Sequence, residues 1–544
     1  MKQVLFQLTF LLIVFSLRGN AQNYYWVAFT DKNDTPYTLS QPEEYLSDRA
    51  IERRIKQRIK IDSLDLPVNQ HYIEEVLKIG AEIKHSSKWL NGVTVLALND
   101  SFQTEVQKLN FVKEVQLSKG SGTKSAVNKF TESGFEPIPI DTSYYGPSVY
   151  QTSTLNGQFL HNQGYNGQGI QIAVLDAGFY NANIYSGMDS LWANNQILGI
   201  RDFVDPYSDI FQTHYHGMSV LSCMGGYVPG TLIGTATKAS FWLLRSEDAE
   251  TEYLIEEDNW VAAAEFADSV GVDIINSSLG YYEFDDPSMN HTYEDMDGYT
   301  TRVTQGANIA ASKGILVVSS AGNEGNDPWK YIISPSDGAN VLGVGAIGKD
   351  SIPAYFTSYG PAYGGAVKPN ITAVGLRAVA QRSNGAFGYI NGTSFSSPIV
   401  AGIAASLWQA FPYATAKQIK GALELSAHLF EEPDSLSGYG IPDLRWSYIL
   451  LKHLSVAEKS NSNQWIVFPN PVRDRIILKS NNNLFYEEVR IELFSMDGKL
   501  VGKWIKQVTN QIELNNLQSI QPGILILKIS TANSTETLKL SKVQ

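Results

Sequence analysis

Short apolar runs alternate with longer stretches of helical pattern in the middle of the chain, from about Tyr150 to Leu454. Uninterrupted apolar runs of strand length are typical of parallel strands that are covered on both faces. The sequence therefore predicts an α/β domain over residues 150–455, built as a parallel sheet with helices on both faces. The predicted strands are Ile170–Leu175, Phe241–Leu244, Val272–Ile275, Ile315–Val318 and Val341–Val344.

The residues before this domain predict a small α+β unit over residues 22–119. Tyr25–Phe29 and Val93–Leu98 are apolar runs of strand length. Asn69–Gly80 places apolar side chains on one face of a predicted helix that ends at a glycine. Residues 120–149 contain glycine, serine and proline with little periodicity, and we interpret them as an exposed linker and a processing region.

The two ends of the chain have patterns of their own. Residues 1–21 combine a lysine, an apolar run from Leu8 to Leu17 and small residues up to Ala21, which is typical of a secretory signal peptide. No other segment approaches the roughly 20 apolar residues of a spanning helix, so we predict no transmembrane segment in the mature chain. From Trp465, alternating strands near Val489–Phe494 and Gly523–Ile529 predict a small all-β, sandwich-like domain over residues 465–544.

Composition and charge narrow the function classes. The formal net charge is -13, which disfavours a nucleic-acid partner because phosphate binding needs clustered lysine and arginine. The single cysteine, Cys223, cannot form an internal disulfide, and we interpret it as a small core residue.

Four segments carry residues that could act chemically. Asp176 follows the first predicted strand of the α/β domain, and the loop Ser320–Gly325 follows another. Ligands gather beyond the carboxyl ends of strands in such sheets. His214 and His216 open a short predicted helix, and Ser394 begins a buried one whose free N–H groups favour an oxyanion. Taken singly, Asp176 also fits a turn residue, and the loop Ser320–Gly325 also fits a plain connection. Ser394 alone also fits a helix cap.

The combination of these residues is more informative than any one of them. A serine hydroxyl is a weak nucleophile until a histidine accepts its proton, and the histidine needs a carboxylate to fix its tautomer and stabilise its charge. Asp176, His216 and Ser394 follow one of the chain orders in which this triad occurs. Two histidines two residues apart could be a metal pair, but no third ligand lies at a recognisable zinc spacing, so we predict no metal site.

At this point the sequence resembles a known family. Four segments, in order and with family-like separations, resemble the signature blocks of the subtilases: Ile172–Gly178, His216–Val220, Ser320–Gly325 and Gly392–Pro398. The resemblance implies that Asp176 orients His216, which acts as general base and then as general acid. It further implies that Ser394 attacks the scissile carbonyl while Asn323 and the Ser394 N–H bind the oxyanion. The family pattern places the base directly before a glycine, which selects His216 over His214.

The resemblance also implies a substrate site and an activity. Asn276–Gly280 is similar to the strand along which subtilases pair the substrate backbone, so the expected cleft residues are Ser278, Leu279 and Gly280. The implied function is a secreted serine endopeptidase that hydrolyses protein or peptide substrates through an acyl-enzyme. The resemblance implies that no cofactor is required. The acidic segments Glu283–Asp286 and Glu294–Gly298 could bind calcium as a structural ion, although we favour a solvated acidic face.

Both ends of the chain extend the resemblance. The N-terminal unit is similar to subtilase propeptides, which are folding templates and temporary inhibitors, and the basic charge of Ser47–Lys60 is interpreted as a solvated face. We hypothesise autoprocessing between Lys119 and Gly146. The tail, with Phe468–Pro471 and Met496–Lys499, looks like the C-terminal sorting domain of type IX secretion. That likeness implies a secretion-machinery partner and export through the periplasm and outer membrane.

Two other functions fit part of the pattern. A surface binding protein on an inactive subtilase scaffold is disfavoured because all four reacting positions hold competent residues. A lipase or esterase would place its serine in a Gly-x-Ser-x-Gly elbow and its histidine last in the chain. Gly392–Ser396, with His216 upstream of it, fits neither feature.

Overall fold

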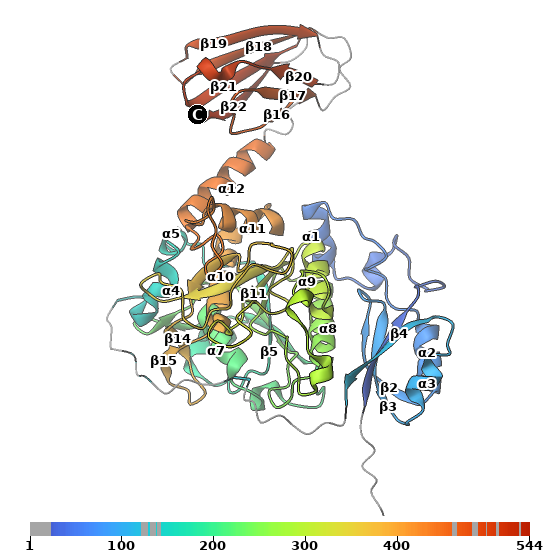
Figure 1. The fold of residues 1–544 in the computed structure, drawn as a ribbon. Helices are drawn as coiled ribbons and strands as arrows, with labels where there is room; N and C mark the ends of the chain where they lie inside the picture. The colour runs from blue at the N-terminus through green and yellow to red at the C-terminus, as the bar shows by residue number, and fades with distance from the viewer. Residues whose placement is uncertain are drawn as a thin grey trace, which may run out of the picture. The chain divides into compact units, whose positions relative to one another are not determined.

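The computed structural model describes residues 23–120, 129–130, 136, 138, 143–459, 465–480, 488–496, 498–507, 511–531 and 535–543. The chain divides into two compact units, residues 1–451 and 452–544, and each is described by itself (Figure 1). The predicted signal peptide and most of the predicted linker lie outside the described residues.

A seven-stranded parallel sheet forms the centre of the first unit, in the order β13-β12-β11-β10-β5-β9-β6. All five predicted strands are present, and the prediction missed the two edge strands. Edge strand β6 is half-exposed and its apolar residues are followed by Arg201 and Asp202, and β13 is only four residues long. The strands are β5 (Gln171–Asp176), β6 (Ile197–Asp202), β9 (Ser240–Arg245), β10 (Ile274–Ser277), β11 (Leu316–Ser320), β12 (Leu342–Ile347) and β13 (Ile371–Val374).

Helices cover both faces of this sheet, as predicted (Figure 1). Alternate residues of β5 point to opposite faces. Ile172 and Val174 belong to one buried cluster with residues of α7 (His216–Gly225) and α10 (Thr393–Ala410). Ala173 and Leu175 belong to a second cluster with residues of α8 (Ile255–Val270) and α9 (Arg302–Ser312). The unit also contains α4 (Val149–Ser153), α5 (Gln158–His161), α6 (Asp189–Ala193) and α11 (Ala416–Leu425), and α12 spans Leu444–Lys459.

The N-terminal domain is a four-stranded antiparallel sheet with helices, which confirms the predicted α+β unit. The predicted helix over Asn69–Gly80 is α2, where the Asn69 side chain accepts a hydrogen bond from the His71 N–H at 2.8 Å. In Figure 1, α2 and α3 lie on one side of this sheet and α8 of the α/β domain lies on the other. The elements are β1 (Tyr24–Phe29), α1 (Asp48–Gln57), α2 (Gln70–Lys78), β2 (Ala81–Ser87), β3 (Gly92–Ala97), α3 (Phe102–Val106) and β4 (Val112–Lys119).

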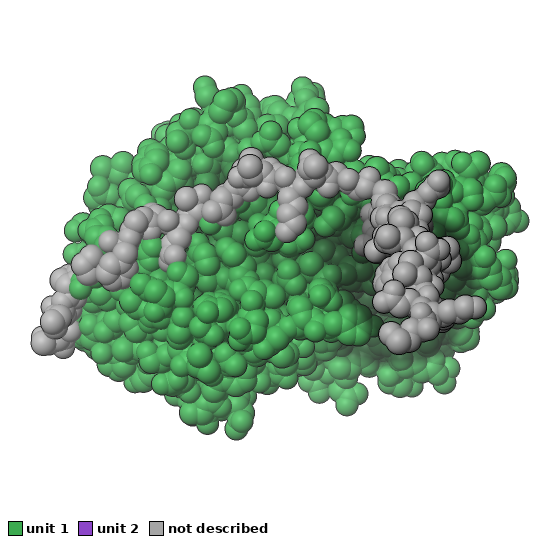
Figure 2. Space-filling model, turned by 90° about the horizontal axis from the view of Figure 1, so that it is seen from below, with its two compact units in different colours: residues 1–451 green, residues 452–544 purple. Residues whose placement is uncertain are grey.

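The basic helix α1 is not the solvated face that we expected. Arg53 is 4% and Arg54 is 1% exposed, and both donate hydrogen bonds to Asp268 on α8. Arg54 also pairs with Asp65, which in turn binds Lys313 of the α/β domain. Arg53 and Arg54 are therefore buried where the two domains of the first unit meet, while Lys56 of α1 is exposed. The described residues of that unit form one packed body (Figure 2).

The second unit contains two antiparallel sheets, and this confirms the predicted all-β domain. Apolar side chains from both sheets share one core, which includes Trp465, Ile491 and Leu527. The helices among the described residues are too short or too polar to cross a membrane. The strands are β16 (Trp465–Phe468), β17 (Ile476–Ser480), β18 (Glu488–Ser495), β19 (Leu500–Gln507), β20 (Gln511–Leu514), β21 (Gly523–Ser530) and β22 (Thr535–Lys542).

Candidate active site

Asp176 and His216 form a buried pair. Asp176 is the last residue of β5 and fully buried, and His216 is the first residue of α7 and 5% exposed. The His216 Nδ1 lies 2.8 Å from the Asp176 Oδ1, which also accepts a hydrogen bond from the Ala177 N–H. A bond at Nδ1 fixes the orientation of the ring, so Nε2 is the atom that can accept a proton.

Gly217 lets α7 begin this close to the aspartate. A Cβ atom at this position would lie 2.5 Å from the carbonyl oxygen of Gly178 and 2.8 Å from the Asp176 Cβ. Both separations are well inside van der Waals contact. Any larger residue would therefore push the first turn of α7, and His216 with it, away from Asp176.

His214 occupies a different position. Its Nδ1 accepts a hydrogen bond from the backbone N–H of His216 at 3.3 Å. Burial, helped by the neighbouring His216 and Arg245, lowers the pKa of His214 to about 3, so the ring is neutral at physiological pH. Of the two histidines singled out in the sequence, the structure brings His216 to the carboxylate of Asp176.

Ser394 is the second residue of α10, directly beyond the end of β10. Its Oγ donates a hydrogen bond to the carbonyl oxygen of Ser278 at 3.3 Å, and the Ser278 Oγ donates to the Ser394 carbonyl at 2.8 Å. Gly392 starts the turn with a φ of 146°, a conformation that favours glycine. The first turn of a helix has free backbone N–H groups, which are suited to a developing negative charge.

Asn323 is held beside the start of the same helix. Its Oδ1 accepts hydrogen bonds from the Thr393 N–H at 2.8 Å and from the Thr393 hydroxyl at 3.1 Å. Both bonds use the oxygen, so the NH₂ group is the end of this side chain that can donate to a ligand. Of the other predicted substrate residues, Leu279 is 4% exposed and Gly280 packs against Ile333.

Three neighbouring strands therefore deliver the candidate residues to one edge of the sheet. The strands β5, β10 and β11 are adjacent and parallel, and Asp176, Ser278 and Asn323 lie at or just beyond their carboxyl ends. The helices α7 and α10 begin at the same edge and contribute His216 and Ser394. This is the edge at which open α/β sheets place their sites.

Comparisons with known proteins match three consecutive parts of the chain. Residues 167–441 match the subtilase family, residues 24–132 match the peptidase S8 propeptide domain of Bacteroidota, and residues 466–543 match a secretion system C-terminal sorting domain. The chain belongs to the subtilase family. It is a serine-type endopeptidase with a propeptide domain, and its sorting domain marks a secreted or cell-surface protein that is exported across the outer membrane.

Individual relatives lie at moderate identity to this subtilase. Subtilisin amylosacchariticus of Bacillus subtilis subsp. amylosacchariticus is 28% identical over 290 residues, 52% of this chain and 67% of the relative. The subtilisin-like protease SBT6.1 of Arabidopsis thaliana is 26% identical over 441 residues, 71% of this chain and 39% of the relative. The crystal structure of MycP1 from the ESX-1 type VII secretion system covers 58% of this chain and 90% of that chain, with 21% identity and a TM-score of 0.42.

Lys129 and Phe130 are site residues that the sequence analysis missed. They lie in the segment that we expected to be an exposed linker, yet the Lys129 side chain is only 12% exposed. The Phe130 ring packs against the His216 ring, with 4.4 Å between their centroids. No sequence signal marks this contact, because it joins a segment of low periodicity to a helix far along the chain.

The two acidic segments considered for calcium have local partners. Asp286 accepts hydrogen bonds from the N–H and hydroxyl of Ser288, and Asp297 accepts them from Tyr299 and Thr300. Bonds of this kind cap turns. Calcium binding at these segments stays a prediction.

Proposed function

We propose that this subtilase hydrolyses peptide bonds through an acyl-enzyme formed on Ser394. The His216 Nε2 takes the hydroxyl proton as the Ser394 Oγ bonds to the substrate carbonyl carbon, and it gives that proton to the leaving amine as the C–N bond breaks. Water then repeats the sequence and releases the acid. Asp176 holds the ring and stabilises its charged form.

The observation that supports this proposal most strongly is the buried contact between the His216 Nδ1 and the Asp176 Oδ1, 2.8 Å long. Asn323 and the backbone N–H of Ser394 donate to the oxyanion that forms in each step. Donors placed in advance at a developing charge stabilise the transition state without having to reorganise.

A serine-reactive fluorophosphonate tests the proposal. The wild-type protein should be labelled and should hydrolyse casein, and Ser394→Ala and His216→Ala should lose both properties. His214→Ala is the matched control, because it removes the neighbouring histidine, and it should retain labelling. A wild-type protein that is not labelled would support an inactive scaffold instead, and hydrolysis of a p-nitrophenyl ester without proteolysis would support an esterase.

We further propose that the N-terminal domain inhibits the enzyme until it is cut away between Lys119 and Gly146. The support is the buried contact of α1 with α8 and the packing of Phe130 on His216. The Ser394→Ala precursor should keep its full size, while the wild-type precursor shortens. Identical sizes for the two proteins would contradict autoprocessing.

A further inference from the structure

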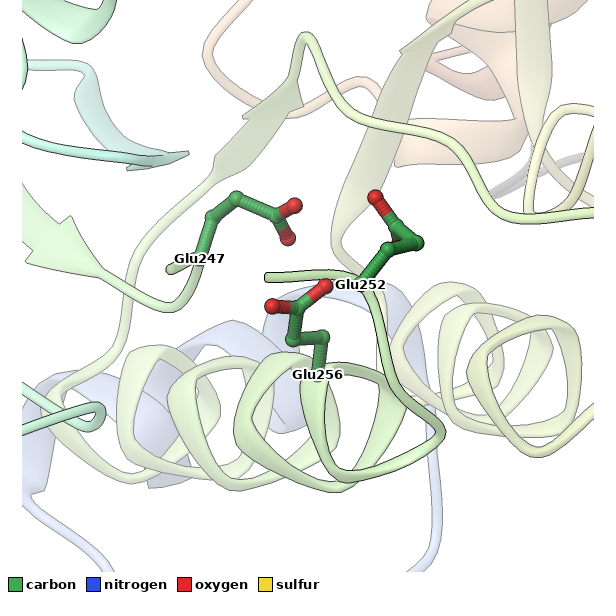
Figure 3. A group of neighbouring side chains, drawn as sticks. All are labelled: Glu247, Glu252 and Glu256. Carbon is green, nitrogen blue, oxygen red and sulfur yellow. The ribbon is translucent and has the colours of Figure 1, made fainter. Parts of the chain in front are cut away.

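Three glutamates converge beside the active site. Glu247 follows β9, Glu252 lies in the loop that leads to α8, and Glu256 is in the first turn of α8. One carboxylate oxygen of each lies within 4.8 Å of the others. In Figure 3 the three carboxylates point toward one another. We refer to Glu247, Glu252 and Glu256 as the glutamate cluster.

The glutamate cluster is buried, and burial of three ionised carboxylates without a compensating charge is unfavourable. Glu247 is 2% exposed and Glu256 is fully buried. Burial, together with the charge of Glu247, raises the pKa of Glu252 to about 8. Among the described residues, the Oε1 atoms of Glu252 and Glu256 have no hydrogen-bond partner. Buried acidic groups of this kind stay ionised only beside a cation and otherwise take up protons.

In the precursor that cation is the ammonium group of Lys129. Its Nζ lies 2.5 Å from Glu247, 2.6 Å from Glu252 and 2.6 Å from Glu256, and it also donates to the carbonyl oxygen of Asp248 at 3.1 Å. An ammonium is a compact charge with three donors, which suits three converging carboxylates. Calcium takes six to eight oxygen ligands, whereas the three carboxylates of the cluster supply three if each binds through one oxygen.

The glutamate cluster binds a residue whose neighbour contacts the active site. Phe130, which directly follows Lys129, packs on the catalytic His216. In the parallel register, Arg245 of β9 pairs with Asp176, so Glu247 comes two residues after a partner of the catalytic aspartate. Lys129 falls within the match to the propeptide domain, residues 24–132. Cleavage after Lys129 would remove this cation from the cluster and leave the three carboxylates in the enzyme.

We propose that in the mature enzyme the glutamate cluster binds a lysine side chain of the substrate, at the residue immediately before the one that packs on His216. Lys129 holds this position in the precursor and is replaced by the substrate. The inference rests on the proposed function, because it assigns substrate specificity to that same site. Loss of a buried hydrogen bond to a charged group weakens binding by about 10- to 100-fold.

The experiment uses two peptides with the sequence of residues 126–136, one with Lys129 and one with norleucine in its place. Norleucine keeps the length of the side chain and removes the ammonium group. Each peptide competes with a fluorogenic casein-derived substrate for the mature, secreted enzyme. We expect the norleucine peptide to have an inhibition constant about 10- to 100-fold higher with the wild type. With Glu256→Gln the two constants should become similar.

Glu294→Gln is the matched control, because Glu294 is exposed and the change removes the same formal charge. It should keep the wild-type preference for the lysine peptide. Glu252→Gln, at the most exposed member of the cluster, serves as a second variant in case Glu256→Gln does not fold. Fluorophosphonate labelling shows which variants are folded and active.

The possible failures can be told apart. If the wild type is not labelled, the proposed function fails and this inference fails with it. If the wild type is labelled but binds both peptides equally, only the lysine assignment is overturned. If millimolar calcium raises the melting temperature of the wild type but not of Glu256→Gln, and the peptides bind equally, the cluster is a metal site and the assignment is also overturned.

Discussion

Asp268 on α8 is the residue on which the contact with the N-terminal domain should depend most. It is fully buried, and its oxygens lie 2.9 and 2.8 Å from the Arg54 Nη2 and 3.2 Å from the Lys88 Nζ, with Arg53 as a further donor. All three cations belong to the N-terminal domain. Asp268→Asn removes the charge of this carboxylate and keeps nearly the same shape.

The expected effect is large because the pairs are buried. Removing one partner of a buried, hydrogen-bonded charge pair at an interface costs about 2–5 kcal/mol. Since 1.4 kcal/mol is a factor of ten in affinity, the inhibition constant should rise about 30-fold or more. The assay titrates the mature enzyme, wild type or Asp268→Asn, with the N-terminal domain. The substitution is in the enzyme, so the inhibitor is identical in both measurements.

The pH dependence has a definite sign. Burial alone would raise the pKa of Asp268, but Lys88, Arg53 and Arg54 outweigh it and hold the pKa well below its usual range. A depressed carboxyl pKa stabilises the complex above the ordinary value of about 3.9, and this contribution is lost only as the pH falls through the depressed value. The effect of Asp268→Asn should therefore be similar at neutral and mildly acidic pH. The control is Asp286→Asn, which removes the same charge from a residue that caps a short 3₁₀ helix. It should leave the inhibition constant unchanged. An unchanged inhibition constant for Asp268→Asn would refute this reasoning.

Three further predictions concern the catalytic domain. Asn323→Ala should lower kcat with little change in KM, by the roughly 10²- to 10³-fold that loss of one oxyanion donor costs subtilisin, and a normal kcat would remove Asn323 from the oxyanion site. Gly217→Ala should sharply slow fluorophosphonate labelling, because the added methyl group displaces His216. The control is Gly421→Ala in α11, where a Cβ meets nothing within 4 Å; it should keep labelling and gain up to about 1 kcal/mol of stability. Equal labelling of the two variants would contradict the steric argument. Burial raises the pKa of Cys223 to about 12, so a thiol reagent should modify it only after unfolding, and rapid reaction of the native enzyme would show that the core opens.

The sequence predicted the parts of the fold whose pattern is local. The five inner strands overlap short, mostly apolar runs, and Asp176 is the last residue of one of these strands. The edge strand β6 was missed although it contains the short apolar run Ile197–Ile200, of which Leu198 and Ile200 are exposed. Burial of Arg53 and Arg54 could not be predicted from the local pattern either, because it depends on an aspartate more than 200 residues away in the chain.

The candidate site also has a part that local sequence patterns predict and a part that depends on distant residues. Order and spacing were enough to predict the pairing of Asp176 with His216, which the structure shows, while the role of Ser394 as the nucleophile stays a prediction. The choice of His216 over His214 came from the resemblance to the family, and the structure gives its physical reason in the position of the ring. The contact of Lys129 with Glu247 joins residues 118 positions apart, and nothing in either segment alone indicates the other.

The strand order of the catalytic sheet has a consequence for the sequence of events after synthesis. β5 is central but is made first, and its two neighbours begin only at Ser240 and Ile274. Closing such long loops slows folding, because their entropy is lost before the strands can pair. The N-terminal domain, in contrast, completes its sheet between Tyr24 and Lys119 through nearby antiparallel partners. We expect the N-terminal domain to fold before β5 can pair with β9 and β10. Its sheet then offers a surface for α8 to pack on before the central parallel sheet has formed.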